Sequence, residues 1–236
     1  SHKHFKNHVF DKNDVDIFVH SWSTESQDKI LQLFKPKKYL IENQIWWDKN
    51  PDRNYRMNNH YSKWYSTMKS VELKNEYEKE TGVKYDMVMV TRFDIAWQTD
   101  IFFEQLNSEH FYAGIWNRRY TLDGKEIKNK LYYNKNWKDS EYKEKLVGYP
   151  HDEGGLIDQW WISNNENMNS FANLFKKMGE YIKLGKQTHD HENAISNHRL
   201  SLHHLKEIGL INKLEFKFYL HDDFPLIRRW YYKCGR

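Results

Sequence analysis

The feature of the sequence that most constrains its fold is a regular alternation of strand-like and helix-like segments in the first half. The strand-like runs are rich in β-branched and aromatic residues and cover residues 15–20, 38–42 and 87–90. The segments between them, 27–34 and 61–79, carry apolar residues at helical spacing. Because strands connected through helices pair in parallel, this order favours an α/β fold with a mostly parallel central sheet flanked by helices.

The second half of the chain is less regular. Helical spacing returns at 168–184 and at 192–208, and the apolar run 214–220 predicts a late strand. No internal repeat, low-complexity stretch or linker divides the sequence. We therefore expect residues 1–236 to form a single domain.

The composition is sufficient for a sizeable hydrophobic core and argues against a dedicated nucleic-acid-binding protein. Hydrophobic residues make up 39% of the 236 residues, and 10 Trp and 16 Tyr supply flat rings that can be buried or can stack on sugars or bases. The net charge is +4, without the dense Lys/Arg blocks of a dedicated nucleic-acid binder. We therefore expect no nucleic-acid partner, although the charge is compatible with a phosphate-bearing ligand.

Cysteine content and hydropathy indicate the compartment. Cys234 is the one cysteine, so no intramolecular disulfide can form, which is typical of a reducing environment. No apolar stretch approaches the ~20 residues of a membrane span, and no export signal is visible. These features predict a cytoplasmic protein without a membrane span.

The apolar run at 87–90 ends in two charged side chains, Arg92 and Asp94. Side chains two apart on an extended segment point to the same side, so both should face one way at the carboxyl end of the strand. A carboxylate there can ligate Mg²⁺ or Mn²⁺, and an arginine beside it can bind a diphosphate oxygen. The alternative is a salt bridge at the end of the strand.

A second candidate is Asp158, which lies in the apolar and aromatic stretch EGGLIDQWW, residues 153–161. Gly154 and Gly155 permit a close approach of the backbone. A carboxylate in such surroundings is either desolvated and poised as a general base or held by hydrogen bonds, for example as a helix cap.

The chain has 13 histidines, but their spacing matches no zinc motif. The stretch 189–204 is best interpreted as a solvated helix start. His221 is a candidate to complete a metal site. His20 and Trp22 follow a strand end and are expected to line the same crevice as Asp94, although a core position for Trp22 is an equal alternative.

Five segments carry, in this order, a resemblance to a known family: DIFVHSWS, FKPKKYLIENQ, SKWYSTMKSVELKNEYEKETGVKYDMVMVTRFDI, IDQWWISNNENM and HENAISNHRL. Together they resemble GT-A-type glycosyltransferases encoded by large DNA viruses of algae and amoebae and by bacterial surface-polysaccharide loci. The ordered series, rather than any single motif, carries the resemblance. It implies a GT-A-like, Rossmann-like fold and, for a viral member, action in the host cytoplasm.

The resemblance also implies roles for the candidate residues. A UDP- or GDP-sugar would be the donor and a glycan hydroxyl the acceptor, with Mn²⁺ or Mg²⁺ bound by Asp94. Arg92 stands where many relatives have a first acidic residue. Asp158 would be the general base of an inverting reaction. The aromatic candidates for stacking on the acceptor sugar are Trp116, Trp160 and Trp161.

One departure from the family concerns the start of the chain. Members usually open with a nucleotide-binding strand, whereas this sequence begins in what matches the following helix.

Two other classes of function remain open from the sequence. One is a non-catalytic carbohydrate- or nucleic-acid-binding module, and the other is a metal-dependent hydrolase built on the histidines of 189–204.

Overall fold

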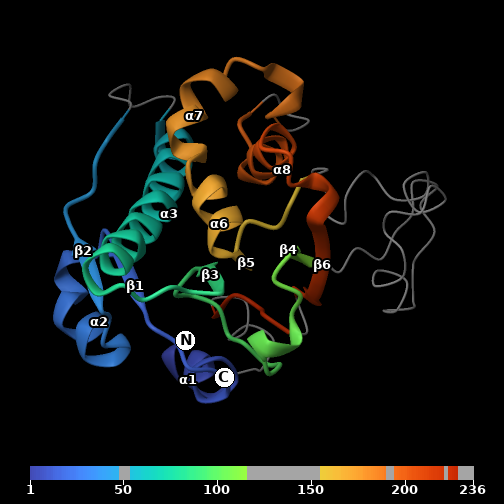
Figure 1. Ribbon diagram of the computed structural model, residues 1–236. Helices are drawn as coiled ribbons and strands as arrows, with labels where there is room; N and C mark the ends of the chain where they lie inside the picture. The colour runs from blue at the N-terminus through green and yellow to red at the C-terminus, as the bar shows by residue number, and fades with distance from the viewer. Residues whose placement is uncertain (48–53, 116–154, 190–193, 221–222, 228–236) are drawn as a thin grey trace, which may run out of the picture.

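A computed structural model of the chain describes residues 1–47, 54–115, 155–189, 194–220 and 223–227 (Figure 1). The helices in these ranges are α1 (His2–His8), α2 (Gln27–Phe34), α3 (Asn54–Thr81), α6 (Asn165–Ala172), α7 (Leu174–Tyr181) and α8 (Asn197–Glu207). The strands are β1 (Phe18–Ser21), β2 (Lys38–Ile41), β3 (Met87–Thr91), β4 (Phe111–Ile115), β5 (Trp160–Asn164) and β6 (Leu214–Tyr219). None of the helices in the described part of the chain is long and apolar enough to cross a lipid bilayer.

The strands form two sheets. β1 and β2 pair in parallel, and a larger sheet has the order β3-β5-β4-β6. In the larger sheet β5 runs antiparallel to both of its neighbours, while β4 and β6 are parallel. The α/β class is confirmed, but the prediction of a mostly parallel central sheet is wrong. β5 is antiparallel to β3 because it begins beside the end of β3 and runs back along it. At this point the backbone N–H of Arg92 donates to the carbonyl of Gln159 (3.2 Å).

Both faces of the larger sheet are buried. In β5, Trp161 packs into a first core cluster, whereas Trp160 and Ile162 pack into a second cluster on the opposite face. The strands β3 and β4 divide their side chains between the same two clusters. Because each face has its own core, these strands are apolar runs instead of alternating apolar and polar residues.

Different elements cover the two faces (Figure 1). The first cluster lies under the helices, with buried side chains from α3, α6, α7 and α8. The second cluster is closed by α1 and by the segments 95–106 and 220–226. Trp97, from one of these segments, is fully buried against Trp160, with ring centroids 5.6 Å apart.

The long helix α3 connects the two sheets. Trp64 of α3 stacks on Trp161 of the larger sheet, with ring centroids 5.3 Å apart. Further along the helix, buried Lys74 pairs with Glu78 (2.9 Å), and Glu78 accepts a hydrogen bond from Asn165 at the start of α6 (2.8 Å). α3 also packs against both strands of the smaller sheet. The helix therefore belongs to both halves of the fold.

Most predicted segments occur within a few residues of the observed ones. The helix expected at 168–184 is instead divided into α6 and α7 at Asn173. There the side chain of Asn173 donates to the carbonyl of Asn169 (3.0 Å). The backbone N–H of Asn173 donates to the carbonyl of Ser170 (3.3 Å). An amide side chain that takes the i−4 carbonyl competes with the helical hydrogen bond. The helix expected at 192–208 begins at Asn197, behind a Ser196 cap.

Gly155 marks the closest contact between the loop before β5 and α8. A Cβ built on Gly155 would lie 2.2 Å from the backbone carbon and oxygen of His198. The contact is held by two hydrogen bonds, Leu156 N to His198 O (2.9 Å) and His198 Nδ1 to Leu156 O (2.8 Å). Only glycine permits this approach, and the approach fixes the loop that carries Asp158.

Gly155→Ala is therefore expected to lower the free energy of unfolding by about 1–3 kcal/mol, because backbone has to move to admit the methyl group. The matched control is Gly179→Ala in α7, where a Cβ meets nothing within 4 Å. Alanine there should be neutral or stabilise the helix by about 0.5–1 kcal/mol. Urea denaturation of both variants measures the difference, and equal stability of the two would contradict the close contact.

Candidate functional site

Five charged or titratable side chains meet where β3 ends and β5 begins. Lys63 comes from α3, Arg92 and Asp94 follow β3, Asp158 precedes β5, and His198 lies in the first turn of α8. We call this set the charged cluster. The three residues singled out from the sequence, Arg92, Asp94 and Asp158, thus lie in one group. Their charges all affect the pKa of Lys63.

Arg92 and Asp94 form a bidentate ion pair. Nε of Arg92 donates to Oδ1 of Asp94 and Nη2 donates to Oδ2, both at 2.8 Å. The two side chains are 39% and 40% exposed, so the pair lies at the surface. The arrangement is the strand-end salt bridge that the sequence allowed as an alternative to a metal ligand. Nη1 of Arg92 takes no part in the pair.

Lys63 and Asp158 form a second, more buried ion pair. Nζ of Lys63 lies 2.7 Å from Oδ2 of Asp158, and the side chains are only 17% and 15% exposed. Lys63 also donates to the backbone carbonyl of Asp158, and its ammonium group lies 5.1 Å from the centre of the Trp161 ring. Burial lowers the pKa of Lys63 to about 8, although the Asp158 charge opposes this shift.

The same pair determines the chemistry of Asp158. Burial by itself would raise the pKa of Asp158, but the charge and hydrogen bond of Lys63 and the charge of Arg92 help to outweigh it and hold the pKa well below its usual range. Asp158 is therefore ionised and held by its ion pair with Lys63. Of the two alternatives from the sequence, this is the carboxylate held by hydrogen bonds. A carboxylate with a strongly lowered pKa is a weak base, so the structure does not support a base made reactive by desolvation.

His198 extends the charged cluster towards α8. Its Nδ1 lies 2.8 Å from the carbonyl of Leu156, which fixes the proton of a neutral ring on that nitrogen, and 3.8 Å from Oδ1 of Asp158. Sequence reasoning missed the roles of Lys63 and His198. Lys63 sits in a helix rich in lysine and glutamate, and His198 gains its position only through the Gly155 contact, so no local signal distinguishes either residue.

His20 and Trp22 lie in a different neighbourhood from Asp94. His20 contacts Ser66 (Nδ1 to Oγ, 2.9 Å) and Glu42 (Nε2 to Oε1, 3.1 Å), and Trp22 stacks on Tyr65. Tyr65 and Lys63 are two residues apart on α3, so they point roughly 200° apart around the helix. The contacts of His20 and Trp22 are thus with the smaller sheet and α3, and not with the charged cluster as expected.

The tryptophans expected to stack on an acceptor sugar are core residues. Trp160 and Trp161 are 0% and 1% exposed because β5 is covered on both faces, and neither ring has a free face for a ligand. Two other candidates, Trp116 and His221, lie outside the described residues.

The described residues do not fit a divalent cation. Both oxygens of Asp94 accept hydrogen bonds from Arg92, and one oxygen of Asp158 is paired with Lys63. Proteins usually bind Mg²⁺ and Mn²⁺ through one or two carboxylates whose oxygens are free to contact the ion, with water and substrate phosphates as the other ligands. Within the described ranges no three side chains of His, Cys, Asp or Glu are grouped so that they could hold an ion.

The histidines of α8 have other partners. Nδ1 of His204 is hydrogen-bonded to the hydroxyl of Tyr181 (2.9 Å), and its Nε2 lies 3.3 Å from the carbonyl of Ser170. His204 is only 2% exposed, and burial lowers its pKa to about 4. His203 contacts the same tyrosine ring edge-on at 4.7 Å. These contacts indicate a structural role and give no support to a zinc-dependent hydrolase.

Comparison with known proteins adds no family to this picture: no protein family matches the chain, and no curated protein is significantly similar to it. The site is therefore interpreted from its own residues.

Breaking the buried ion pair should be costly. We expect Lys63→Met or Asp158→Asn to lower the free energy of unfolding by about 3–5 kcal/mol, because each leaves a buried charge unpaired. The double variant should lose clearly less than the sum of the single variants. Lys177→Met, which removes an exposed pair with Glu180, is the control and should change stability little. Additive losses in urea denaturation would contradict the coupling.

His204 should make stability depend on pH. Its folded pKa of about 4 lies below the ordinary 6.5, so between these values the unfolded chain binds a proton that the folded chain excludes. The stabilisation is complete above pH 6.5 and declines as the pH falls towards 4, by about 3 kcal/mol in total. Denaturation at pH 7 and pH 4.5 should show a smaller loss for His204→Gln than for the wild type. Equal losses would exclude His204 as the source.

Proposed function

We propose that the protein is a nucleotide-sugar glycosyltransferase with a GT-A-like fold, which moves a sugar from a UDP- or GDP-sugar to a glycan hydroxyl. The observation that carries the proposal is the convergence of Arg92, Asp94 and Asp158 with Lys63 in one charged cluster. These residues come from three separate segments of the chain, and the resemblance assigns the donor and acceptor chemistry to the same three positions.

The location of the charged cluster supports a ligand site. In α/β proteins ligands bind outside the carboxyl ends of strands, where side chains project from a rigid sheet. Arg92 and Asp94 occupy that position on β3, whose backbone is hydrogen-bonded to β5 along its length. Asp158 is held beside them by Lys63 and by the Gly155 contact with α8. The site is therefore rigid on the protein side before any ligand binds.

Arg92 supplies the hydrogen-bond donors for a diphosphate. Nη1 of Arg92 carries N–H groups that the pair with Asp94 does not use. Such guanidinium N–H groups commonly donate to phosphate oxygens. The charge of Lys63 is already neutralised by Asp158, so Lys63 acts by positioning that carboxylate. Arg92 would stabilise the departing nucleoside diphosphate as the bond from the sugar C1 to the phosphate oxygen breaks.

Asp158 would contact the acceptor. It stays ionised across the physiological range, so it can accept a hydrogen bond from the attacking hydroxyl and orient that oxygen towards C1. The hydroxyl becomes acidic only as its bond to the sugar forms, and the carboxylate takes the proton at that late stage. Lys63 positions Asp158 for this role by fixing the other carboxylate oxygen.

Donor binding is the first test. A nucleotide-sugar at a concentration 100 times its Kd should raise the free energy of unfolding by about 2.7 kcal/mol, as seen in a thermal-shift screen of UDP-, GDP- and dTDP-sugars with and without Mn²⁺. Arg92→Gln should weaken donor binding, because it removes the exposed guanidinium. Lys6→Gln, in an exposed pair with Asp11, is the control and should bind as the wild type does. If no nucleotide or nucleotide-sugar stabilises the protein, the proposal fails.

The second test separates binding from transfer. Asp158→Asn, once shown to be folded by circular dichroism, should retain donor binding and lose about 10²–10⁴-fold in transfer to the acceptor. The readout is release of the nucleoside diphosphate in the presence of a glycan mixture, compared with calorimetric binding of the donor. Near-normal turnover by this variant would remove Asp158 from the reaction.

A further inference from the structure

The smaller sheet has a polar and aromatic site of its own at the carboxyl ends of its two parallel strands. His20 lies near the end of β1, Trp22 follows that strand, and Glu42 follows β2 directly. Glu42 remains joined to β1, since its backbone N–H donates to Ser21 O (3.1 Å). Carboxyl ends of parallel strands are where α/β sheets bind ligands.

Glu42 is positioned by His20, which is itself in contact with α3. The imidazole of His20 is 0% exposed and lies 3.1 Å from Oε1 of Glu42. Its other nitrogen lies 2.9 Å from Oγ of Ser66, which itself donates to the carbonyl of Ser62 (2.8 Å). Together these contacts fix a carboxylate that is still 29% exposed.

Five aromatic rings in mutual contact lie beside Glu42, and we call them the aromatic cluster: Trp22, Trp47, Tyr61, Tyr65 and Phe175. Trp22 stacks on Tyr65 with centroids 5.3 Å apart, and Trp47 stacks on Tyr61 at 5.7 Å. Tyr65 joins the rings to the polar group, since burial and a hydrogen bond to Glu42 both raise its pKa. The neighbouring Trp46 is 57% exposed.

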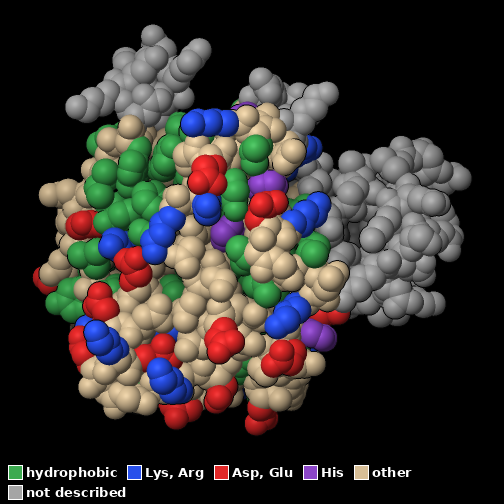
Figure 2. Space-filling model, turned by 45° about the horizontal axis from the view of Figure 1, so that its top comes forward, with side chains coloured by type: hydrophobic (Ala, Val, Ile, Leu, Met, Phe, Trp, Pro, Cys, Tyr) green, Lys and Arg blue, Asp and Glu red, His purple; other side chains and the backbone are tan. Residues whose placement is uncertain are grey.

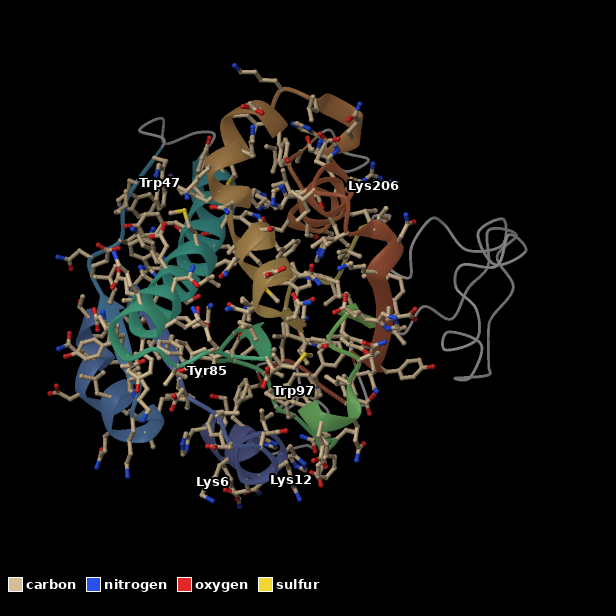
Figure 3. The ribbon with its side chains drawn as sticks, viewed as in Figure 1. Lys6, Lys12, Trp47, Tyr85, Trp97 and Lys206 are labelled. Atoms are coloured by element: carbon tan, nitrogen blue, oxygen red, sulfur yellow. The ribbon has the colours of Figure 1, made fainter. Side chains whose placement is uncertain are left out.

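All five rings of the aromatic cluster are only partly buried, so the cluster reaches the surface. Figure 3 shows Trp47 beside the upper part of α3, on the side away from β6. In Figure 2 hydrophobic side chains gather on that same side of the molecule. Lys69, which lies over the Tyr65 ring, is paired with Glu72 (2.8 Å).

We propose that the aromatic cluster and Glu42 together form a binding site for a neutral sugar ring. A hexose presents an apolar C–H face, which packs on an aromatic ring, and hydroxyl groups, which donate to a fixed carboxylate. A phosphate-bearing ligand does not fit, because the exposed group at the centre is negative and the nearby lysine is already paired. An apolar peptide does not fit either, since it would strip water from Glu42 without replacing the hydrogen bonds.

This site is separate from the charged cluster, because Lys63 and Tyr65 point to opposite sides of α3. The inference therefore does not depend on the transferase proposal. A neutral-sugar site would equally serve a non-catalytic binding protein, and in a transferase it would hold the glycan that receives the new sugar.

The test uses the full chain on a printed panel of neutral hexose, deoxyhexose and N-acetylhexosamine oligosaccharides, followed by calorimetry with the best binder. Glu42→Gln keeps the shape of the side chain and removes its charge, and it should weaken binding at least 10-fold. Trp22→Ala should weaken it at least as much. Tyr39→Ala, which removes an aromatic side chain of β2 that is 48% exposed, is the matched control and should bind normally.

Three results would overturn the inference: no neutral oligosaccharide binds, the two site variants bind as well as the wild type, or only charged saccharides bind. Circular dichroism establishes first that each variant is folded. Titration with UDP-sugar in parallel keeps the two proposals distinguishable, because Glu42→Gln should leave donor binding at the charged cluster unchanged.

Discussion

The rest of the structure depends on the burial of the larger sheet on both faces. The side chains of β3, β4 and β5 point alternately into two separate apolar clusters, so these strands have no polar face. Charged groups can then approach the sheet only where its strands begin or end. This constraint explains why Arg92, Asp94 and Asp158 stand at such ends, and why the region between them is filled by tryptophan and isoleucine.

Charge at the edge of a core has to be compensated. Lys63 and Asp158 neutralise one another in a position that is largely closed to water, and Arg92 and Asp94 do so at the surface. The compensation stabilises the fold and also limits the chemistry, because it makes Asp158 a weak base and occupies the oxygens of Asp94. Any anionic ligand has to be bound by N–H groups that these pairs do not use, which gives Arg92 the most direct role in the proposed reaction.

The helix α3 separates two different environments. One side presents Lys63 to the larger sheet and contributes to the charged cluster, while the opposite side presents Tyr65 to the aromatic cluster. One environment is built from paired full charges and the other from aromatic rings beside a single carboxylate. Their chemistry suits ligands of different kinds, a diphosphate in the first case and a neutral sugar in the second. A transferase requires both kinds of contact.

The local pattern of the sequence determined the α/β class, the place of the strand at 87–91, most of α3, and the ion-pairing neighbours Arg92 and Asp94, because each depends on residues a few positions apart. Only the tertiary structure decided the rest. The antiparallel course of β5 depends on its entry beside β3, which also explains the burial of Trp160 and Trp161. The partner of Asp158 is Lys63, 95 residues earlier in the chain, and His198 reaches the site only because Gly155 admits the α8 backbone. Such pairings arise from packing between distant segments, and the periodicity of a single segment contains no information about them.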